Sequence, residues 1–275
     1  MNMSRKLTQV IGIASGKGGV GKTSIASNLA VSLVMRGHKV MLFDADLGLA
    51  NAQLAFGCRT EFNFSHVLSG QKTLKEIVVT TRQGVRLVPG ASGMQHLASL
   101  DGPKAAGIVQ AFSELDEDID YFIIDSAAGI ADSVVTFMQA AQRRYIVMRD
   151  EPSSIADAYG MIKVLSLELG LNEIYLVPNM VESQEAGEVL YTRVNDVCKR
   201  FLGADIGYLH SITNDGHMLD AIRAYKSVLE FAPGGNAARD FRQLAVATEG
   251  LAQIGDMTGG MQFFLERFIA SVSAT

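Results

Sequence analysis

The feature that most constrains the fold is the segment SGKGGVGKT, residues Ser15–Thr23, which directly follows the apolar run Val10–Ala14. It contains the pattern G-x-x-x-x-G-K-[ST], which is typical of a phosphate-binding loop between a strand and a helix. Glycines let such a loop curl so that several backbone N–H groups point at one phosphate group, and the helix N-terminus adds a positive potential. We therefore predict nucleotide contacts from the whole loop, namely Ser15, Gly16, Lys17, Gly18, Gly19, Val20, Gly21, Lys22, Thr23 and Ser24.

Two side chains at the end of this loop have the clearest roles. Lys22 is expected to reach the β- and γ-phosphates, and the Thr23 hydroxyl is expected to ligate Mg²⁺. A glycine-rich turn with incidental lysines is the alternative. The apolar run before the loop and the helical pattern after it argue against that alternative.

Short apolar runs alternate with longer amphipathic segments along the chain, which predicts an α/β fold with a doubly wound, mainly parallel sheet. Runs that are apolar throughout fit strands covered by helices on both faces. We expect strands at Val10–Ala14, Val40–Phe43, Val85–Val88, Tyr121–Ile124, Tyr145–Met148, Ile174–Val177 and Ile206–Leu209. We expect helices at Lys22–Arg36, Pro103–Leu115, Asp132–Gln142, Ser154–Leu169, Gly187–Phe201 and Gly216–Ala224.

Acidic residues follow two of the expected strands, where ligands bind in sheets of this kind. Asp125 comes after four apolar residues and fits the carboxylate that holds Mg²⁺, often through water. Asp46 fits a residue that orients the attacking water, and Asp44 is predicted to support the loop or the magnesium shell. A single aspartate at a strand end is more often a turn or helix-capping residue, but here two such strand ends follow a phosphate-binding loop.

Lys17 is a second lysine in the loop, five residues before Lys22. It cannot easily reach the phosphates of its own loop, because the loop backbone already surrounds them, so we expect it to point outward. The stretch GKGGVGKT resembles the deviant Walker A motif of the MinD/ParA ATPases. The resemblance implies that Lys17 reaches the phosphates of a partner subunit in an ATP-dependent homodimer.

Further segments narrow the resemblance to the FlhG (FleN) branch of MinD-like ATPases, which limits the number of flagella and helps to place them. They include Asp44–Asn51, Ala91–Gly93, Ala111–Ser113, Ala127–Ile130 and Asp150–Tyr159. The resemblance implies slow, Mg²⁺-dependent ATP hydrolysis. It also implies partners, namely an FlhF-type GTPase, a flagellar transcription regulator of the FleQ kind and flagellar basal-body proteins.

The same resemblance suggests roles for residues outside the loop. Asn179 and Asp215 occupy positions that face the nucleotide base in the family. Gly129 is placed to sense the γ-phosphate through its backbone. Glu151 or Asp157 is expected to contact the partner's Lys17, with a solvated helix start as the alternative.

The C-terminal residues have an amphipathic pattern. One apolar face is formed, on a 3.6-residue period, by Met261, Phe264, Leu265, Phe268, Ile269 and Val272. We therefore expect residues 1–258 to form a single MinD-like ATPase domain and residues 259–275 a helix that binds the membrane peripherally. This segment is too short to span a bilayer but long enough to lie in its interface. The alternative is a final helix that stays packed on the domain.

Composition limits the other possibilities. The formal net charge is −5 and no basic cluster stands out, so direct nucleic-acid binding is not expected. Cys58 and Cys198 are far apart, which argues against a metal or iron–sulfur site and for a reducing compartment. No signal peptide or long apolar span is evident, so we expect a cytoplasmic protein that binds reversibly to the inner face of the membrane. The alternatives are a MinD-type division-site regulator, a ParA-type DNA-partitioning ATPase and, least favoured, an iron–sulfur carrier.

Overall fold

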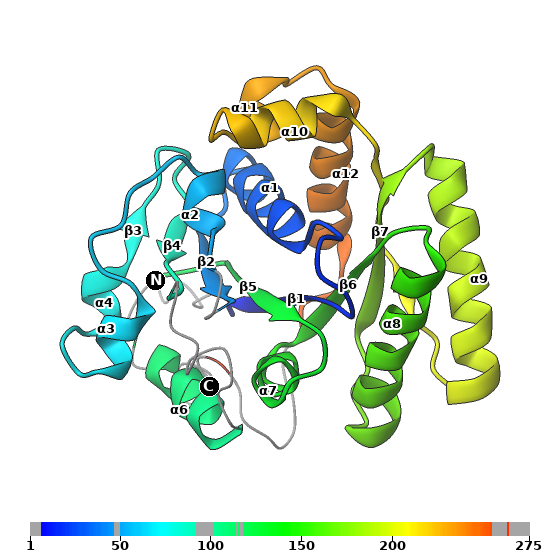
Figure 1. Cartoon of the computed structure of the whole chain (residues 1–275), viewed down its shortest axis with the longest axis horizontal. Helices are drawn as coiled ribbons and strands as arrows, with labels where there is room; N and C mark the ends of the chain where they lie inside the picture. Colours follow the sequence, from blue (N-terminus) through cyan, green and yellow to red (C-terminus); the bar gives the residue numbers. More distant parts are fainter. Residues whose placement is uncertain are drawn as a thin grey trace, which may run out of the picture.

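The computed structural model describes residues 7–46, 50–91, 102–113, 115, 118–254 and 263, and a mainly parallel sheet lies at its centre (Figure 1). The strands are β1 Gln9–Ser15, β2 Val40–Ala45, β3 Val79–Thr80, β4 Arg86–Val88, β5 Tyr121–Ala128, β6 Arg143–Met148, β7 Ile174–Val181, β8 Gly207–Tyr208 and β9 Ile212–Thr213. They follow the order β3-β4-β2-β5-β1-β6-β7-β8, and β9 pairs with β7. The β3–β4 pair is antiparallel, whereas the other pairings are parallel.

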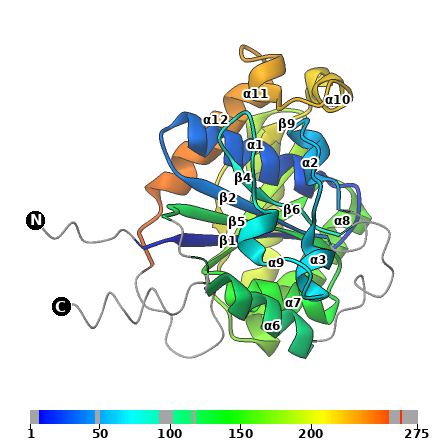
Figure 2. The same ribbon diagram turned by 90° about the vertical axis from the view of Figure 1, so that its left-hand side faces the viewer.

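Helices cover both faces of the sheet, as expected for a doubly wound fold. They are α1 Lys22–Met35, α2 Ala52–Ala55, α3 Phe64–Leu68, α4 Leu74–Ile77, α6 Gly102–Ser113, α7 Asp132–Ala140, α8 Pro152–Lys163 with the π-helical turn η1 Val164–Glu168, α9 Gln184–Leu202, α10 Gly216–Arg223, α11 Val228–Phe231 and α12 Asn236–Gly250. In Figure 2 the sheet is seen nearly edge-on, with α1, α10, α11 and α12 above it and α6 and α7 below it.

The central strand β1 shows how the sequence builds two cores. Its buried residues alternate between the faces, so that Ile11 and Ile13 join the cluster under α1 and α12. Val10 and Ala14 join the cluster on the side of α6, α7, α8 and α9. This period of two is the ordinary consequence of strand geometry. Both faces are covered, so the run Val10–Ala14 within β1 carries no polar side chain, and this confirms the sequence-based interpretation.

All seven predicted strands are present, but α12 was not predicted from the sequence. The buried side of α12 is formed largely by small side chains, including Ala237, Ala238 and Ala245, with Phe241 and Leu244 as the large members. Alanines give a weak apolar stripe, so the helical period is hard to recognise from the sequence. The predicted helix Ser154–Leu169 begins two residues earlier, at Pro152, and its last turn is the π-helical segment η1.

The predicted membrane-binding segment 259–275, and with it the proposed domain boundary, lies outside the described residues except for Phe263. Phe263 is buried, with 5% of its surface exposed. Its ring centroid lies 5.4 Å from that of Phe112, 5.1 Å from Phe122 and 6.5 Å from Phe137. Phe263 is not one of the residues on the predicted apolar face, and it attaches this part of the chain to α6, β5 and α7. Among the described helices, none has the length and apolar character needed to cross a bilayer.

Candidate nucleotide and magnesium site

The predicted phosphate-binding loop connects β1 to α1 and has the backbone shape that the motif requires. Gly19 and Gly21 have φ angles of +80° and +94°, a left-handed conformation that side chains other than glycine rarely adopt. Gly21 is the N-cap of α1, and no side chain caps that end of the helix. The first N–H groups of α1 therefore face the loop with the positive end of the helix dipole, as an anion site requires.

Two neighbouring segments hold this loop by close backbone approach. A Cβ atom on Gly16 would lie 2.3 Å from the carbonyl oxygen of Asp157 in α8, and one on Gly21 would lie 2.3 Å from Nδ2 of Asn179. The Asn179 amide donates a hydrogen bond of 2.7 Å to the Val20 carbonyl. Glycine is thus required at both positions because α8 and the end of β7 pack directly on the loop. The sequence pattern alone could not reveal these two contacts.

Asp125 is the residue whose surroundings best fit a bound cation. It lies near the end of β5, with 1% of its surface exposed, and neither carboxylate oxygen accepts a hydrogen bond of normal geometry among the described residues. Burial raises its pKa to about 6, while the nearby Thr23 hydroxyl and the Lys22 ammonium oppose that rise. A buried carboxylate without partners is costly, and a divalent cation held between it and a phosphate would supply the missing counter-charge.

Asp44 lies beside Asp125 because the two residues are in register in the β2–β5 pair. Its carboxylate accepts backbone N–H groups from Asn51 at 2.9 Å and Ala52 at 2.8 Å, so it organises the segment after β2. Burial, followed by the charge of Asp125, raises its pKa to about 8. Its predicted role as a metal ligand stays a prediction, whereas its predicted role in supporting the loop agrees with these bonds.

The two aspartates and Thr23 can hold magnesium only together with other ligands. No group of three or more His, Cys, Asp or Glu side chains in the described part of the chain is arranged to bind a metal ion. Mg²⁺ keeps an octahedral shell of oxygens and commonly takes several of them from phosphates and water. The donor set therefore fits Mg²⁺ that arrives with a nucleotide. Asp46 follows β2, and its charge raises the pKa of both Asp44 and Asp125, which places it on the same side of the site.

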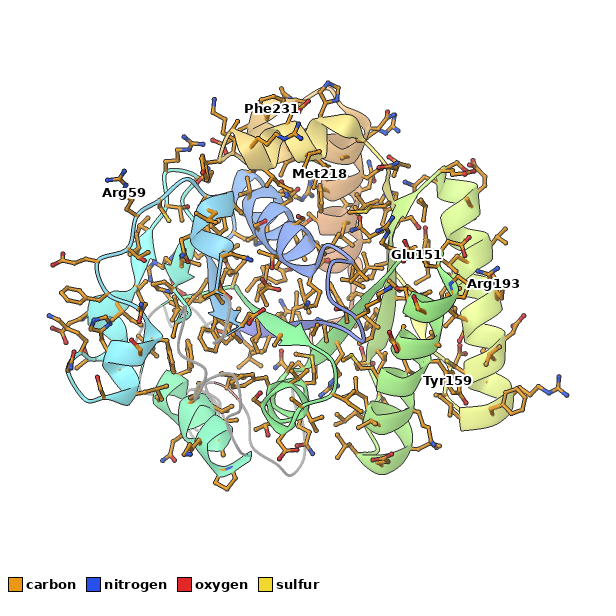
Figure 3. The ribbon with its side chains drawn as sticks, viewed as in Figure 1. Arg59, Glu151, Tyr159, Arg193, Met218 and Phe231 are labelled. Atoms are coloured by element: carbon orange, nitrogen blue, oxygen red, sulfur yellow. The ribbon has the colours of Figure 1, made fainter. Side chains whose placement is uncertain are left out.

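Lys17 contacts the first turn of α8 in its own chain. It is half-exposed, and its Nζ donates to the Ser153 hydroxyl at 2.9 Å and lies 3.8 Å from the Glu151 carboxylate. Arg149 also pairs with Glu151, at 3.2 Å. Figure 3 shows Glu151 at the N-terminal end of α8, beside Arg193 on α9. Arg193 forms an ion pair with Asp150 at 2.6 Å. The predicted contact of Glu151 or Asp157 with a partner's Lys17 concerns a dimer and stays a prediction.

The two residues predicted to face the nucleotide base, Asn179 and Asp215, form hydrogen bonds within the domain. Asn179 supports the loop through Val20, as described above. Asp215 caps α10 by accepting the His217 N–H at 2.9 Å, and it also accepts the Ala237 N–H at 3.1 Å. Gly129 has a φ angle of +88°, and its N–H donates to the Ser15 carbonyl at 2.9 Å. Contacts of Asn179 and Asp215 with a base, and of Gly129 with a γ-phosphate, stay predictions.

The chain is similar to proteins of one family over most of its length. The family model described as ParA, NUBPL iron-transfer P-loop NTPase, matches residues 6–245. The antiactivator FleN of Pseudomonas aeruginosa is 38% identical, covering 95% of this chain and 93% of FleN. The flagellum site-determining protein YlxH of Helicobacter pylori is 36% identical, covering 86% of this chain and 81% of YlxH. The structure of the septum site-determining protein MinD from Pyrococcus horikoshii, complexed with Mg-ADP, is 27% identical with a TM-score of 0.75, covering 90% of this chain and 100% of that chain.

Burial of Asp125 predicts that magnesium binding depends on pH. Folding raises the pKa of Asp125, so the carboxyl keeps its proton to a higher pH and must release it when Mg²⁺ binds. We expect the affinity for Mg-ADP to rise by up to about tenfold per pH unit below about pH 6, the pKa of Asp125, and to level off above it. Isothermal titration in buffers of different ionisation enthalpy would measure both the affinity and the protons released.

Asp125→Asn is the control for this measurement, because titration of the nucleotide's own phosphate is common to both proteins. The variant should bind Mg-ADP more weakly and with a shallower dependence on pH. Equal pH dependence in the two proteins would contradict the assignment of Asp125 to the magnesium site.

Proposed function

Because the chain belongs to the ParA family of P-loop NTPases, we propose that it is a nucleotide-driven switch that regulates the number and placement of flagella. It is a Mg²⁺-dependent ATPase that binds ATP as substrate and ADP as product, and it has the fold of MinD. The observation that carries the proposal is an intact phosphate-binding loop with a second lysine, Lys17, in a chain similar to FleN over 95% of its length.

The phosphate-binding loop and the residues at the strand ends have different roles in phosphoryl transfer. The curled backbone from Gly16 to Gly21 and the start of α1 hold the phosphates, and Lys22 places its charge beside Asp125. Mg²⁺, when bound, neutralises charge on the β- and γ-phosphates. Thr23 and Asp125 are assigned to hold the ion, and Asp46 is assigned to orient the attacking water. Such chemistry depends mainly on positioning and electrostatic stabilisation.

Lys17 is assigned to act in trans, at the phosphates of a second copy of the chain. Its position supports this role, because its side chain extends from the loop towards the first turn of α8 at the surface rather than towards Lys22. The contacts with Ser153 and Glu151 are exposed and therefore weak, of the order of 1 kcal/mol or less. A partner's triphosphate, with several negative charges, can displace them. ATP thus favours a dimer, and hydrolysis releases it.

The proposed regulation of flagella rests on similarity to two bacterial proteins. FleN is named an antiactivator and YlxH a flagellum site-determining protein. We assign contacts with a flagellar transcription regulator of the FleQ kind, an FlhF-type GTPase and basal-body proteins to this chain. A MinD-type role in division is the second candidate, because the fold matches that of MinD. Iron transfer gains no support from Cys58 and Cys198, which are free thiols whose pKa values are raised by burial.

The C-terminal segment is assigned to the membrane. Its predicted polar face carries one arginine and one glutamate, so attraction to anionic lipids is weak for a single helix. Two helices in one ATP-bound dimer bind together with a higher effective concentration, which couples membrane residence to nucleotide state. The burial of Phe263 against α6, β5 and α7 supports a segment that can fold back on the domain.

The trans role of Lys17 predicts a specific defect. Lys17→Ala should bind ATP but neither dimerise nor hydrolyse it efficiently, because the partner's phosphates lose a counter-charge. Light scattering with and without ATP measures the dimer. Lys22→Ala is the control, since it should fail earlier, at nucleotide binding. If Lys17→Ala forms an ATP-dependent dimer of normal affinity, Lys17 does not act at the phosphates of the partner subunit.

The membrane assignment predicts nucleotide-dependent binding to lipid. The intact protein should co-sediment with vesicles in the presence of ATP and much less with ADP. Deletion of residues 260–275, or Phe268→Glu, should abolish the binding. Equal sedimentation with ADP and ATP would rule out the coupling, and no sedimentation in either state would favour a helix packed permanently on the domain.

The flagellar role predicts a cellular phenotype. A strain lacking the gene should show an altered number or position of flagella, with division sites placed normally. Electron microscopy of flagella, with cell length and minicells scored in the same cells, separates the two candidate roles. Normal flagella together with misplaced septa would favour the MinD-type role instead.

A further inference from the structure

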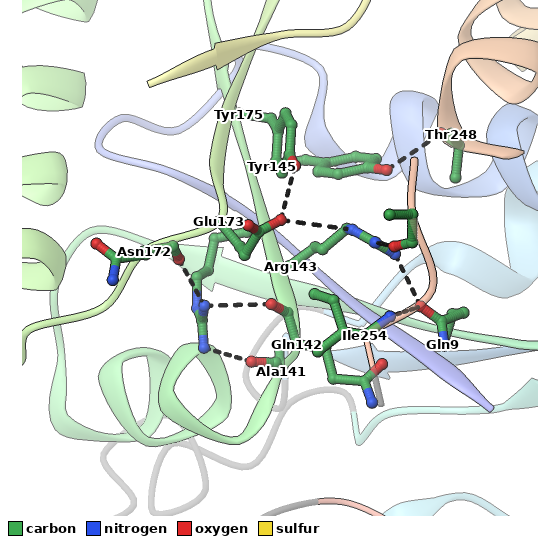
Figure 4. A network of polar contacts seen from close by, with 12 residues as sticks. Gln9, Ala141, Gln142, Arg143, Tyr145, Asn172, Glu173, Tyr175, Thr248 and Ile254 are labelled. Atoms are coloured by element: carbon green, nitrogen blue, oxygen red, sulfur yellow. Dashed lines mark hydrogen bonds and ion pairs between the residues drawn. The ribbon is translucent and has the colours of Figure 1, made fainter. Parts of the chain in front are cut away.

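Two adjacent arginines in β6, Arg143 and Arg144, are buried in the domain, with 2% and 1% of their surfaces exposed. Figure 4 shows Arg143 within its network of polar contacts. They lie at the start of the strand, far from the phosphate-binding loop. A guanidinium group is expensive to bury unless hydrogen bonds replace its contacts with water. The partners of each arginine therefore show what it holds in place.

Arg144 ties together parts of the ATPase domain itself. It donates to the carbonyl groups of Met138 at 2.8 Å and Asn172 at 2.8 Å, and also to that of Ala141. These groups lie at the end of α7 and just before β7. Burial lowers the pKa of Arg144 to about 10, so the side chain stays charged at neutral pH. It satisfies carbonyl groups at the end of a helix, which is a structural task.

Arg143 instead holds the chain that follows α12. Its guanidinium donates to the Gln9 side-chain oxygen at 2.8 Å and to the Ala252 carbonyl. The same Gln9 oxygen accepts the N–H of Ile254 at 3.3 Å. Glu173 supplies a carboxylate 3.8 Å from the guanidinium. Arg143 and Gln9 together therefore fix the backbone of residues 252–254 against the first residue of β1.

We infer that Arg143 is a positioning residue. It fixes residues 252–254, here called the root of the C-terminal segment, at the end of the sheet opposite the nucleotide. Gln9 begins β1 and Ser15 ends it beside the loop, so the root and the nucleotide are separated by a seven-residue strand, about 20 Å long. The root stays attached in every nucleotide state. Residues 252–254 therefore take no part in the exchange between domain and membrane proposed above. This inference rests on the membrane role proposed above.

A fixed root has a direct consequence for the switch. It limits the volume that the C-terminal segment can explore, which favours its return to the α6–α7 surface after hydrolysis. With a loose root, the folded-back state loses part of this advantage, and the segment is available to lipid even with ADP. A merely structural role for Arg143 would lower stability without changing the balance between nucleotide states.

Arg143→Met is the test, and Arg144→Met is its matched control on the next position of the strand. Hydrogen exchange of the full chain with ADP should be about tenfold faster at Ile254 in Arg143→Met, since the segment opens more often. Arg144→Met should leave that amide unchanged and accelerate exchange at the end of α7 instead. Equal exchange at Ile254 in the two variants, after correction for global stability, would overturn the inference. Should Arg143→Met fail to fold, Gln9→Leu removes the shared acceptor and should show the same local effect.

Vesicles of phosphatidylethanolamine and phosphatidylglycerol test the consequence for the switch. With ADP, Arg143→Met should co-sediment more than the wild type with ADP but less than the wild type with ATP, because a released single helix still lacks the second helix of the dimer. Arg144→Met should keep the wild-type contrast between nucleotides. Unchanged sedimentation of Arg143→Met with ADP would overturn the link between the root and the membrane. If the wild type shows no ATP-dependent binding, the proposed membrane role fails, and the exchange data alone decide whether Arg143 fixes the root.

Discussion

The pairing of β2, β5 and β1 brings a buried carboxylate, Asp125, next to the lysine of the phosphate-binding loop, and the rest of the site depends on this contact. Parallel strands end at one edge of the sheet, so the loop after β1, Asp44 and Asp125 meet there without long connections. Burial makes the ionised form of Asp125 costly until a cation shares the site. If Asp125 holds the ion as predicted, phosphate and magnesium binding are linked to each other and to proton release.

The sequence was enough to predict this arrangement in outline. The motif from Gly16 to Thr23 identified the loop, and the apolar runs identified the strands, because each pattern has a direct physical cause. Other features depend on contacts between distant segments. The register that places Asp44 beside Asp125, the packing of Asp157 on Gly16 and the bond from Asn179 to Val20 are not visible in any local pattern. Burial of Arg143 and Arg144 runs against the usual preference of charged residues for the surface, so composition gave no sign of it.

The contacts of Lys17 connect the loop to the mechanism of the switch. In the single chain the lysine is held by Ser153 and Glu151 at the start of α8, and an ion pair between Asp150 and Arg193 links that turn to α9. In the proposed dimer, Lys17 would exchange these weak, exposed contacts for strong ones with a partner's phosphates. Because the gain would be largest with the γ-phosphate present, the proposal makes the nucleotide set the balance between monomer and dimer.

In the proposed dimer each site is completed by Lys17 of the partner subunit, and complementation between two inactive variants provides a direct test. In a mixed dimer of Lys17→Ala and Asp46→Ala, the site in the Lys17→Ala chain keeps its own Asp46 and receives an intact Lys17 from the other chain. ATP turnover should be near background for each variant alone and should reappear when the two are mixed. A mixture that remains at background, although mixed dimers form, would contradict the account.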